Sequence, residues 1–301
     1  MRLEHPIFKG PLTAEIPTHE IATPAEYHDA QDAPRLVAWT VQDGTLGDTV
    51  DYGLVSGPFG FEDSPDAEWI SGGSNSKYAR AVALGRHGNW FLWGFAGDPT
   101  QMTPAARAVF LNAVAWMDRF DGHGPLVAMS SGTAKYLARD GVVATCGFIG
   151  EEPDGTGAEY YLTQFPRRVI KEVGLHGPKL ARYYQERLEY LRADLVRARL
   201  GSSEIDACHL DADATLEARG VGNRSPAFLA LVQNLLAHGG ADGATAAELV
   251  ARYLPADAPR EAAPFAAWVA ERRERMYFSD RYGYRWFVAP TDLPPRALAP
   301  R

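Results

Sequence analysis

The chain has 301 residues, of which 46% are hydrophobic and 23% charged, and this composition is typical of a globular protein with one large domain or two small ones. Its formal net charge of −8 argues against nucleic acid as a partner, because phosphate binding needs a concentrated basic surface. No apolar run reaches the roughly 18 residues of a membrane span, and the first residues show no signal peptide. We therefore expect a cytoplasmic protein that does not associate with membranes.

The first third of the chain contains short apolar runs separated by turn residues. Residues 35–41 and 52–57 predict buried strands, and the composition of 57–77 predicts a long loop. Two apolar runs then flank Gly88, which can adopt a positive φ, and they predict a β-hairpin. Thr103 followed by Pro104 predicts the start of an amphipathic helix that ends near residue 121.

From about residue 125 onward helical patterns dominate, and the chain closes with two alternating aromatic runs at 276–288 that predict a β-hairpin. We expect residues 289–301 to be disordered. The expected helices are 131–140, 159–173, 178–200, 226–238, 245–254 and 263–276.

Three stretches of the first third resemble a known family: HPIFKGP (5–11), FGFEDSPDAEWISGG (59–73) and the long stretch 82–117. Together they are similar to the later half of a ThuA-like domain, which is the trehalose-utilisation branch of the class I glutamine amidotransferase-like fold. The segments 182–191, 220–232 and 278–288 resemble the helical extension of large bacterial proteins that carry such a domain. The resemblance implies an α/β domain over 1–124 and a helical extension with a terminal hairpin over 125–288.

The chain departs from this family in two ways. ThuA-like domains begin with a parallel sheet core, whereas Met1 of this chain stands almost directly before the matching region. We therefore expect a shortened start, a partner chain that completes the sheet, or a remodelled fold. The late strand of the family commonly ends in Leu-Gly-His, and here Phe95 stands at the corresponding place. A histidine there could act as an acid, a base or a ligand, but phenylalanine can do none of these.

Catalytic motifs are scarce. No Gly-x-Ser-x-Gly or Gly-x-Cys-x-Gly nucleophile elbow occurs. Cys146 and Cys208 are the only cysteines, which excludes a disulfide framework and a Cys-rich zinc site, and we interpret both as free thiols. We expect no cofactor.

The segment SGGSNSK (71–77) is the best candidate for anion or ligand binding, because two glycines let backbone N–H groups converge and polar side chains add donors. An ordinary turn explains the same residues. On the strand at 90–95, Trp93 shares a face with two phenylalanines, and this face either stacks on a sugar or packs against the helix that follows Thr103. The candidate ligand-binding residues are Gly72, Gly73, Ser74, Asn75 and Trp93.

Two acidic segments could in principle hold a metal ion. One contains Glu62, Asp63, Asp66 and Glu68, and the other is 206–217. Neither has the spacing of a known metal motif. A capped turn explains the first segment, and Asp211 as the cap of a short helix explains the second, so we expect no metal site.

The resulting fold prediction is α/β, with a partial ThuA-like sheet, followed by a mainly α-helical domain with a small C-terminal β-hairpin. Our first functional hypothesis is a non-catalytic or degenerate ThuA-like protein with a binding or scaffolding role in carbohydrate metabolism, so a small carbohydrate is the expected ligand. The second is a hydrolase of a sugar derivative with its site in loops 62–77 and 94–98, where Asp63 or Asp98 would be the base and Lys77 the anion clamp. The third is a structural subunit that completes its sheet in a homo-oligomer or with a partner chain.

Overall fold

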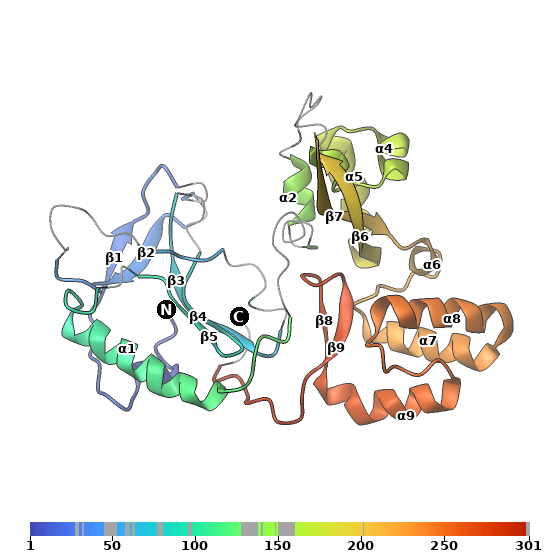
Figure 1. The fold of residues 1–301 in the computed structure, drawn as a ribbon. Helices are drawn as coiled ribbons and strands as arrows, with labels where there is room; N and C mark the ends of the chain where they lie inside the picture. The colour runs from blue at the N-terminus through green and yellow to red at the C-terminus, as the bar shows by residue number, and fades with distance from the viewer. Residues whose placement is uncertain are drawn as a thin grey trace. The chain divides into compact units, whose positions relative to one another are not determined.

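The computed structural model describes the chain except for residues 28–29, 32, 45–52, 58–60, 62–63, 77–80, 96–97, 128–137, 140, 148, 150–159, 201 and 299–301. It forms two compact units, and each is described by itself (Figure 1). Unit 1 comprises Met1–Leu126 with Asp292–Arg301, and unit 2 comprises Val127–Thr291. Helices and small antiparallel sheets both occur, which confirms a mixed α/β protein.

Unit 1 contains two small antiparallel sheets. The first is the hairpin of β1 (Thr18–Ala22) and β2 (Arg35–Trp39). The second has three strands in the order β3 (Ala67–Gly73), β4 (Ala81–His87) and β5 (Trp90–Trp93).

The strand predictions before β4 are right only in part. The strand expected at 35–41 exists as β2, but its side chains are exposed or half-buried because it pairs only with the exposed β1. In the expected strand 52–57, described from Gly53, Ser56 makes an isolated bridge to Val82. The loop predicted for 57–77 is wrong over Ala67–Gly73, which forms β3. Gly72 and Gly73 suggested a turn in the sequence, but they end a strand that is mostly buried.

The predicted hairpin around Gly88 is confirmed as β4 and β5. Gly88 has a φ of 57°, and a Cβ added to it would lie 2.5 Å from the backbone nitrogen of Pro125. Only glycine fits this turn, because an added Cβ would be both strained and too close to its neighbour.

The predicted helix after Thr103 is also confirmed as α1 (Pro104–Met117). The Thr103 hydroxyl accepts a hydrogen bond from the Ala106 amide at 3.1 Å, as an N-cap residue does. Two 3₁₀ turns complete this layer, η1 (Pro6–Phe8) and η2 (Asp118–Phe120). The core of unit 1 joins them to the three-stranded sheet and contains Ile7, Phe8, Ile70, Leu84, Val109, Ala113, Trp116 and Phe120.

The chain end also contributes to unit 1. Residues 289–301 are expected to be disordered, but the described part of this segment makes specific contacts with β3 and the turn before it. Arg296 donates to the carbonyl oxygens of Ser64 and Pro65, and the Ala297 amide donates to Glu68 Oε2 at 3.0 Å.

Unit 2 is mainly helical, with two β-hairpins. The hairpins are β6 (Leu191–Leu200) with β7 (Ser203–Ala212), and β8 (Met276–Ser279) with β9 (Arg285–Val288). The second hairpin confirms the aromatic hairpin predicted at 276–288. The helical segments are α2 (Val142–Gly147), α4 (Arg167–Val173), α5 (Gly177–Gln185), η4 (Leu188–Tyr190), α6 (Ala214–Glu217), α7 (Pro226–His238), α8 (Gly240–Tyr253), α9 (Ala262–Arg272) and η5 (Arg273–Arg275).

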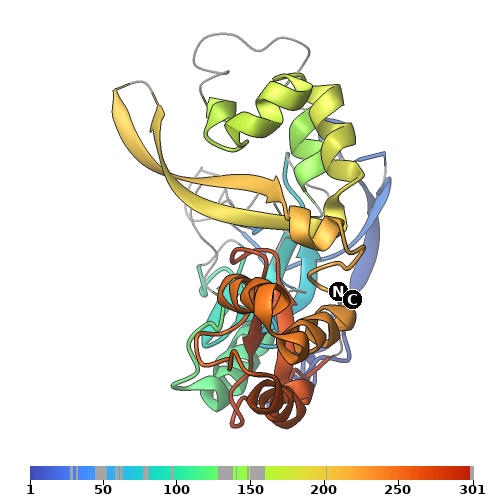
Figure 2. The same ribbon diagram turned by 90° about the vertical axis from the view of Figure 1, so that its right-hand side faces the viewer.

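The single long helix predicted for 178–200 is wrong. Helix α5 ends at Gln185, and Leu191 begins a ten-residue strand that pairs along its whole length with β7. Leu188 and Leu191 fit a helical stripe, but Leu191, Ala193 and Leu195 fit a two-residue alternation equally well. Figure 2 shows the result as a long twisted ribbon of two strands within unit 2. The helix predicted at 131–140 lies mostly outside the described residues.

Candidate functional site

Unit 1 contains a cleft of about 770 Å³. Strands β1, β2 and β3 supply most of its wall, and Met1 and Phe95 complete it. The wall residues are Met1, Ile21, Ala33, Pro34, Arg35, Leu36, Val37, Ala38, Trp39, Trp69, Ser71, Gly72, Gly73, Ser74 and Phe95.

Three aromatic side chains give the cleft its apolar surface: Trp39 at the end of β2, Trp69 in β3, and Phe95 after β5. The rings of Trp39 and Phe95 meet edge to face with centroids 5.5 Å apart and planes at 88°. This geometry is favourable for aromatic pairs, so the two rings hold each other in the wall.

Strand β3 is irregular where it lines the cleft. Its register with β4 shifts between Trp69 and Ser71 and again between Ser71 and Gly72. Such bulges redirect side chains and are common beside binding sites. Here the bulge lies where two serines and two glycines enter the wall.

The predicted ligand-binding residues separate into two groups. Gly72, Gly73 and Ser74 line the cleft, whereas Asn75 and Trp93 are not among its wall residues. Gly72 and Gly73 belong to strand β3 and have no positive φ. They therefore do not form the loop of converging N–H groups that an anion site needs. A Cβ on Gly73 would lie 2.7 Å from Val55 Cγ1, which indicates a close-packing role for this glycine.

Of the two roles expected for Trp93, stacking on a sugar and packing against α1, the structure supports packing. Its ring meets Phe110 of α1 at 5.2 Å and Phe95 at 5.3 Å between centroids. Trp93 therefore supports Phe95 from behind, and Phe95 is the residue of this stretch that reaches the cleft.

The described wall of the cleft contains no carboxylate and no histidine. Arg35 is its charged side chain, and it forms an exposed ion pair with Glu20 at 2.9 Å. Acid–base catalysis needs a titratable group within hydrogen-bond reach of the reacting atoms. The described part of the cleft offers aromatic faces, hydroxyls, peptide groups and one guanidinium instead.

The predicted catalytic residue Asp98 is a half-buried residue at the start of a turn, outside this wall. Its Oδ1 accepts hydrogen bonds from the hydroxyl of Thr100 at 2.7 Å and from its amide at 2.8 Å. These bonds lower the pKa of Asp98, so it is held as a carboxylate in the turn. The other two candidates, Asp63 and Lys77, lie outside the described residues.

The acidic segment around β3 forms a buried network. Glu68 Oε1 accepts from Arg86 Nε at 3.0 Å and from Arg86 Nη2 at 2.8 Å, and Glu68 Oε2 lies 3.5 Å from His5 Nε2. The Arg86 guanidinium is fully buried, and its Cζ lies 3.8 Å from the ring centroid of Phe120. Burial would raise the pKa of Glu68, but the His5 hydrogen bond and the Arg86 charge outweigh burial and lower it.

Asp66 also makes hydrogen bonds that stabilise the fold. It accepts hydrogen bonds from the Ser64 hydroxyl and, at 2.8 Å, from the Leu126 amide. Both described carboxylates of the first acidic segment therefore hold the fold together and do not face the cleft.

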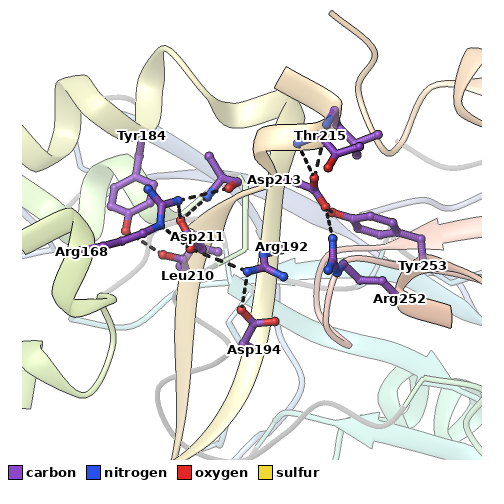
Figure 3. Close-up of polar contacts among 12 residues, drawn as sticks. Arg168, Tyr184, Arg192, Asp194, Leu210, Asp211, Asp213, Thr215, Arg252 and Tyr253 are labelled. Carbon is purple, nitrogen blue, oxygen red and sulfur yellow. Dashed lines mark hydrogen bonds and ion pairs between the residues drawn. The ribbon is translucent and has the colours of Figure 1, made fainter. Parts of the chain in front are cut away.

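The second acidic segment, 206–217, lies at the base of the β6–β7 hairpin (Figure 3). Asp211 is not the expected helix cap: its Oδ2 accepts from Arg168 Nε at 2.9 Å and its Oδ1 accepts from Arg168 Nη2. Asp213 caps α6 through the amides of Thr215 and Leu216, and its other oxygen accepts from Arg252 at 2.6 Å and from Tyr253 at 2.8 Å.

These carboxylates have little capacity left for a metal ion, because protein donors already occupy their oxygens. Within the described part of the chain, no group of three or more His, Cys, Asp or Glu side chains is arranged to hold one. The two cysteines are buried, and burial raises the pKa of Cys146 to about 12 and of Cys208 to about 11. Thiols of this kind are poor nucleophiles at neutral pH.

Sequence reasoning missed the residues of β2 that form one side of the cleft. Arg35 is the single polar residue of the run 35–39, which therefore predicts a buried strand and carries no signal for an open cleft wall.

Comparison with known proteins does not assign a family. No family model matches the chain, and no curated protein or solved structure is significantly similar to it. None of the described helices is long and apolar enough to cross a membrane.

Proposed function

We propose that unit 1 is a ligand-binding module whose cleft holds a small carbohydrate without transforming it. The observation that carries the proposal is the chemistry of the described wall. It combines three aromatic rings with two serine hydroxyls and open peptide groups, and it lacks a carboxylate or a histidine.

The cleft suits such a ligand in size and in lining. Its volume of about 770 Å³ falls within the range of roughly 300–1,000 Å³ that is usual for small-molecule sites. Sugars present apolar C–H faces that pack on aromatic rings, while their hydroxyls need hydrogen-bond partners. The faces of Trp39 and Trp69 meet the first need, and the hydroxyls of Ser71 and Ser74 meet the second.

The absence of paired carboxylates favours binding over hydrolysis. Glycoside hydrolysis generally uses two carboxyl groups that flank the scissile bond. The described wall holds no carboxylate, and its cation, Arg35, pairs with Glu20, a single acid outside the wall. The resemblance of 82–117 to ThuA-like domains independently supports a role in carbohydrate metabolism, and we infer a binding or scaffolding role within it.

The proposal can be tested by titrating the full chain with a panel of monosaccharides and disaccharides while recording tryptophan fluorescence and binding heat. We expect at least one sugar to bind and Trp39→Ala to weaken its binding by about tenfold or more, because an aromatic anchor of a site is lost. The matched control is Trp90→Ala. Trp90 is 71% exposed and lies outside the cleft wall, so this variant should bind like the wild type.

Three results would decide against the proposal. One is that no sugar of the panel binds, and another is that Trp39→Ala binds as well as the control while both variants keep the wild-type circular dichroism. The third is release of a new product during prolonged incubation with the bound sugar. Hydrolysis of this kind would favour the hydrolase hypothesis, with Asp63, Asp98 and Lys77 as its candidate residues.

A further inference from the structure

Helix α1 presents an apolar surface to solvent. Its inward face packs Val109 and Trp116 into the core of unit 1, as expected for an amphipathic helix. Its outward face should then be polar, but Leu111 is 48% exposed and Val114 is 58% exposed.

Two charged residues bracket this apolar stripe. Arg107 and Asp118 are both exposed, and they lie on the same side of the helix as Leu111 and Val114. The spacing of positions 107, 111, 114 and 118 alternates between four and three residues, which is the spacing of a helix–helix seam.

The placement of the two charges is unfavourable for an isolated helix. The N-terminal end of a helix favours negative side chains, and its C-terminal end favours positive ones. Here Arg107 stands near the start of α1 and Asp118 at its end, and α1 has no acidic residue in its first turn and no basic residue in its last. An antiparallel partner helix with the same sequence would place the opposite charge at both ends.

We propose that α1 is a self-association surface on which a second copy of this chain docks, with the two α1 helices antiparallel about a twofold axis. In this arrangement Arg107 of each copy meets Asp118 of the other, and Leu111 of each copy meets Val114 of the other. A twofold interface must be complementary to itself, and this stripe satisfies that condition in both charge and apolar pattern.

The size of the surface sets the strength of the contact. A helix of 14 residues is about 21 Å long, so two such helices bury less area than a standard stable interface. The structure therefore assigns a weak dimer whose population rises with protein concentration.

The test is sedimentation analysis of the full chain over about a hundredfold range of concentration, with charge-reversal variants. Arg107→Asp and Asp118→Arg should each weaken the dimer by about tenfold or more, because each replaces two attractions with two repulsions. An equimolar mixture of the two variants should dimerise again, since both contacts become attractive in the mixed pair. The control is Arg119→Asp, which makes the same charge change as Arg107→Asp but lies off the stripe, just after the C-terminal end of α1.

Several outcomes would overturn the assignment. The wild-type chain could remain monomeric at every concentration, which would mean that another part of the chain or a different protein covers α1. Arg119→Asp could weaken the dimer as much as Arg107→Asp, or the mixture could fail to recover. Circular dichroism and thermal unfolding of each variant show whether α1 is intact, so a loss of folding is not mistaken for a loss of association.

Discussion

The buried pair of Glu68 and Arg86 should be the most sensitive point of unit 1, and Glu68→Gln tests it. The substitution keeps the size of the side chain but removes its charge. In the structure one carboxylate oxygen accepts both bonds from Arg86, and the other faces the Ala297 amide and His5 Nε2. Glutamine replaces one of these oxygens with an NH₂ group. Either the Arg86 guanidinium or the Ala297 amide with His5 must then face a donor in place of an acceptor.

The expected cost follows from burial. Arg86 is fully buried, and removing one partner of a buried ion pair typically costs about 3–5 kcal/mol. For a unit of this size such a loss corresponds to a decrease of roughly 10 °C in melting temperature. The matched control is Glu20→Gln, which breaks the Arg35 pair. In that pair the side chains are 60% and 61% exposed, so the cost should stay below about 1 kcal/mol.

Urea unfolding at neutral pH, followed by tryptophan fluorescence, measures both variants. A second signature is the pH dependence. The pKa of Glu68 is lowered from its ordinary value of 4.5, so its stabilising contribution is present above that pH and is lost as the pH falls through the folded-state pKa. Glu68→Gln should lack this acid-dependent loss. The reasoning is refuted if Glu68→Gln and Glu20→Gln are equally stable, or if the wild type and Glu68→Gln lose stability in parallel on acidification.

Three further predictions concern other parts of the fold. Asp213→Ala should destabilise unit 2 by about 2 kcal/mol or more in urea, because it removes the cap of α6 and leaves the buried Tyr253 hydroxyl without its acceptor. Gly88→Ala should destabilise unit 1 by about 1–3 kcal/mol, since Gly88 has a φ of 57° and the new Cβ would meet backbone at 2.5 Å. Gly124→Ala, whose Cβ would meet no atom within 4 Å, should have little effect. With pKa values of about 12 and 11, Cys146 and Cys208 should react with a disulfide reagent at neutral pH only after unfolding, and rapid labelling of the folded chain would contradict this.

Local chemistry explains which elements are predictable from the sequence. Thr103 starts α1 by accepting a hydrogen bond from a free amide of its first turn, and Pro104 has no amide hydrogen to leave unpaired. Gly88 makes the β4–β5 turn because it can adopt a positive φ. Both signals lie within a few residues of the structure that they specify. The same holds for the aromatic alternation of β8 and β9.

The errors arise where a distant segment decides the outcome. Residues 191–200 form a strand because 203–212 pairs with them, and neither segment alone excludes a helix. Ala67–Gly73 is a strand because β4 pairs with it despite its glycines. The cleft depends on more distant contacts still, because its wall joins two separate sheets. Strand β2 pairs with β1 and β3 pairs with β4, and the segment between β2 and β3 gives no sign that both line one cleft.

Strand β3 connects the stability of unit 1 to its proposed function. Glu68 is held by Arg86, and the next residue, Trp69, begins the irregular stretch that lines the cleft. The ion pair therefore fixes the strand directly before the bulge that sets the positions of Trp69 and Ser71. If the cleft binds a sugar, Glu68→Gln should lower both stability and affinity, whereas Trp39→Ala should lower mainly affinity, because Trp39 is a half-buried residue on the two-stranded sheet. Full affinity in a destabilised Glu68→Gln protein would show that the bulge keeps its shape without the ion pair, and the link argued from β3 would then fail.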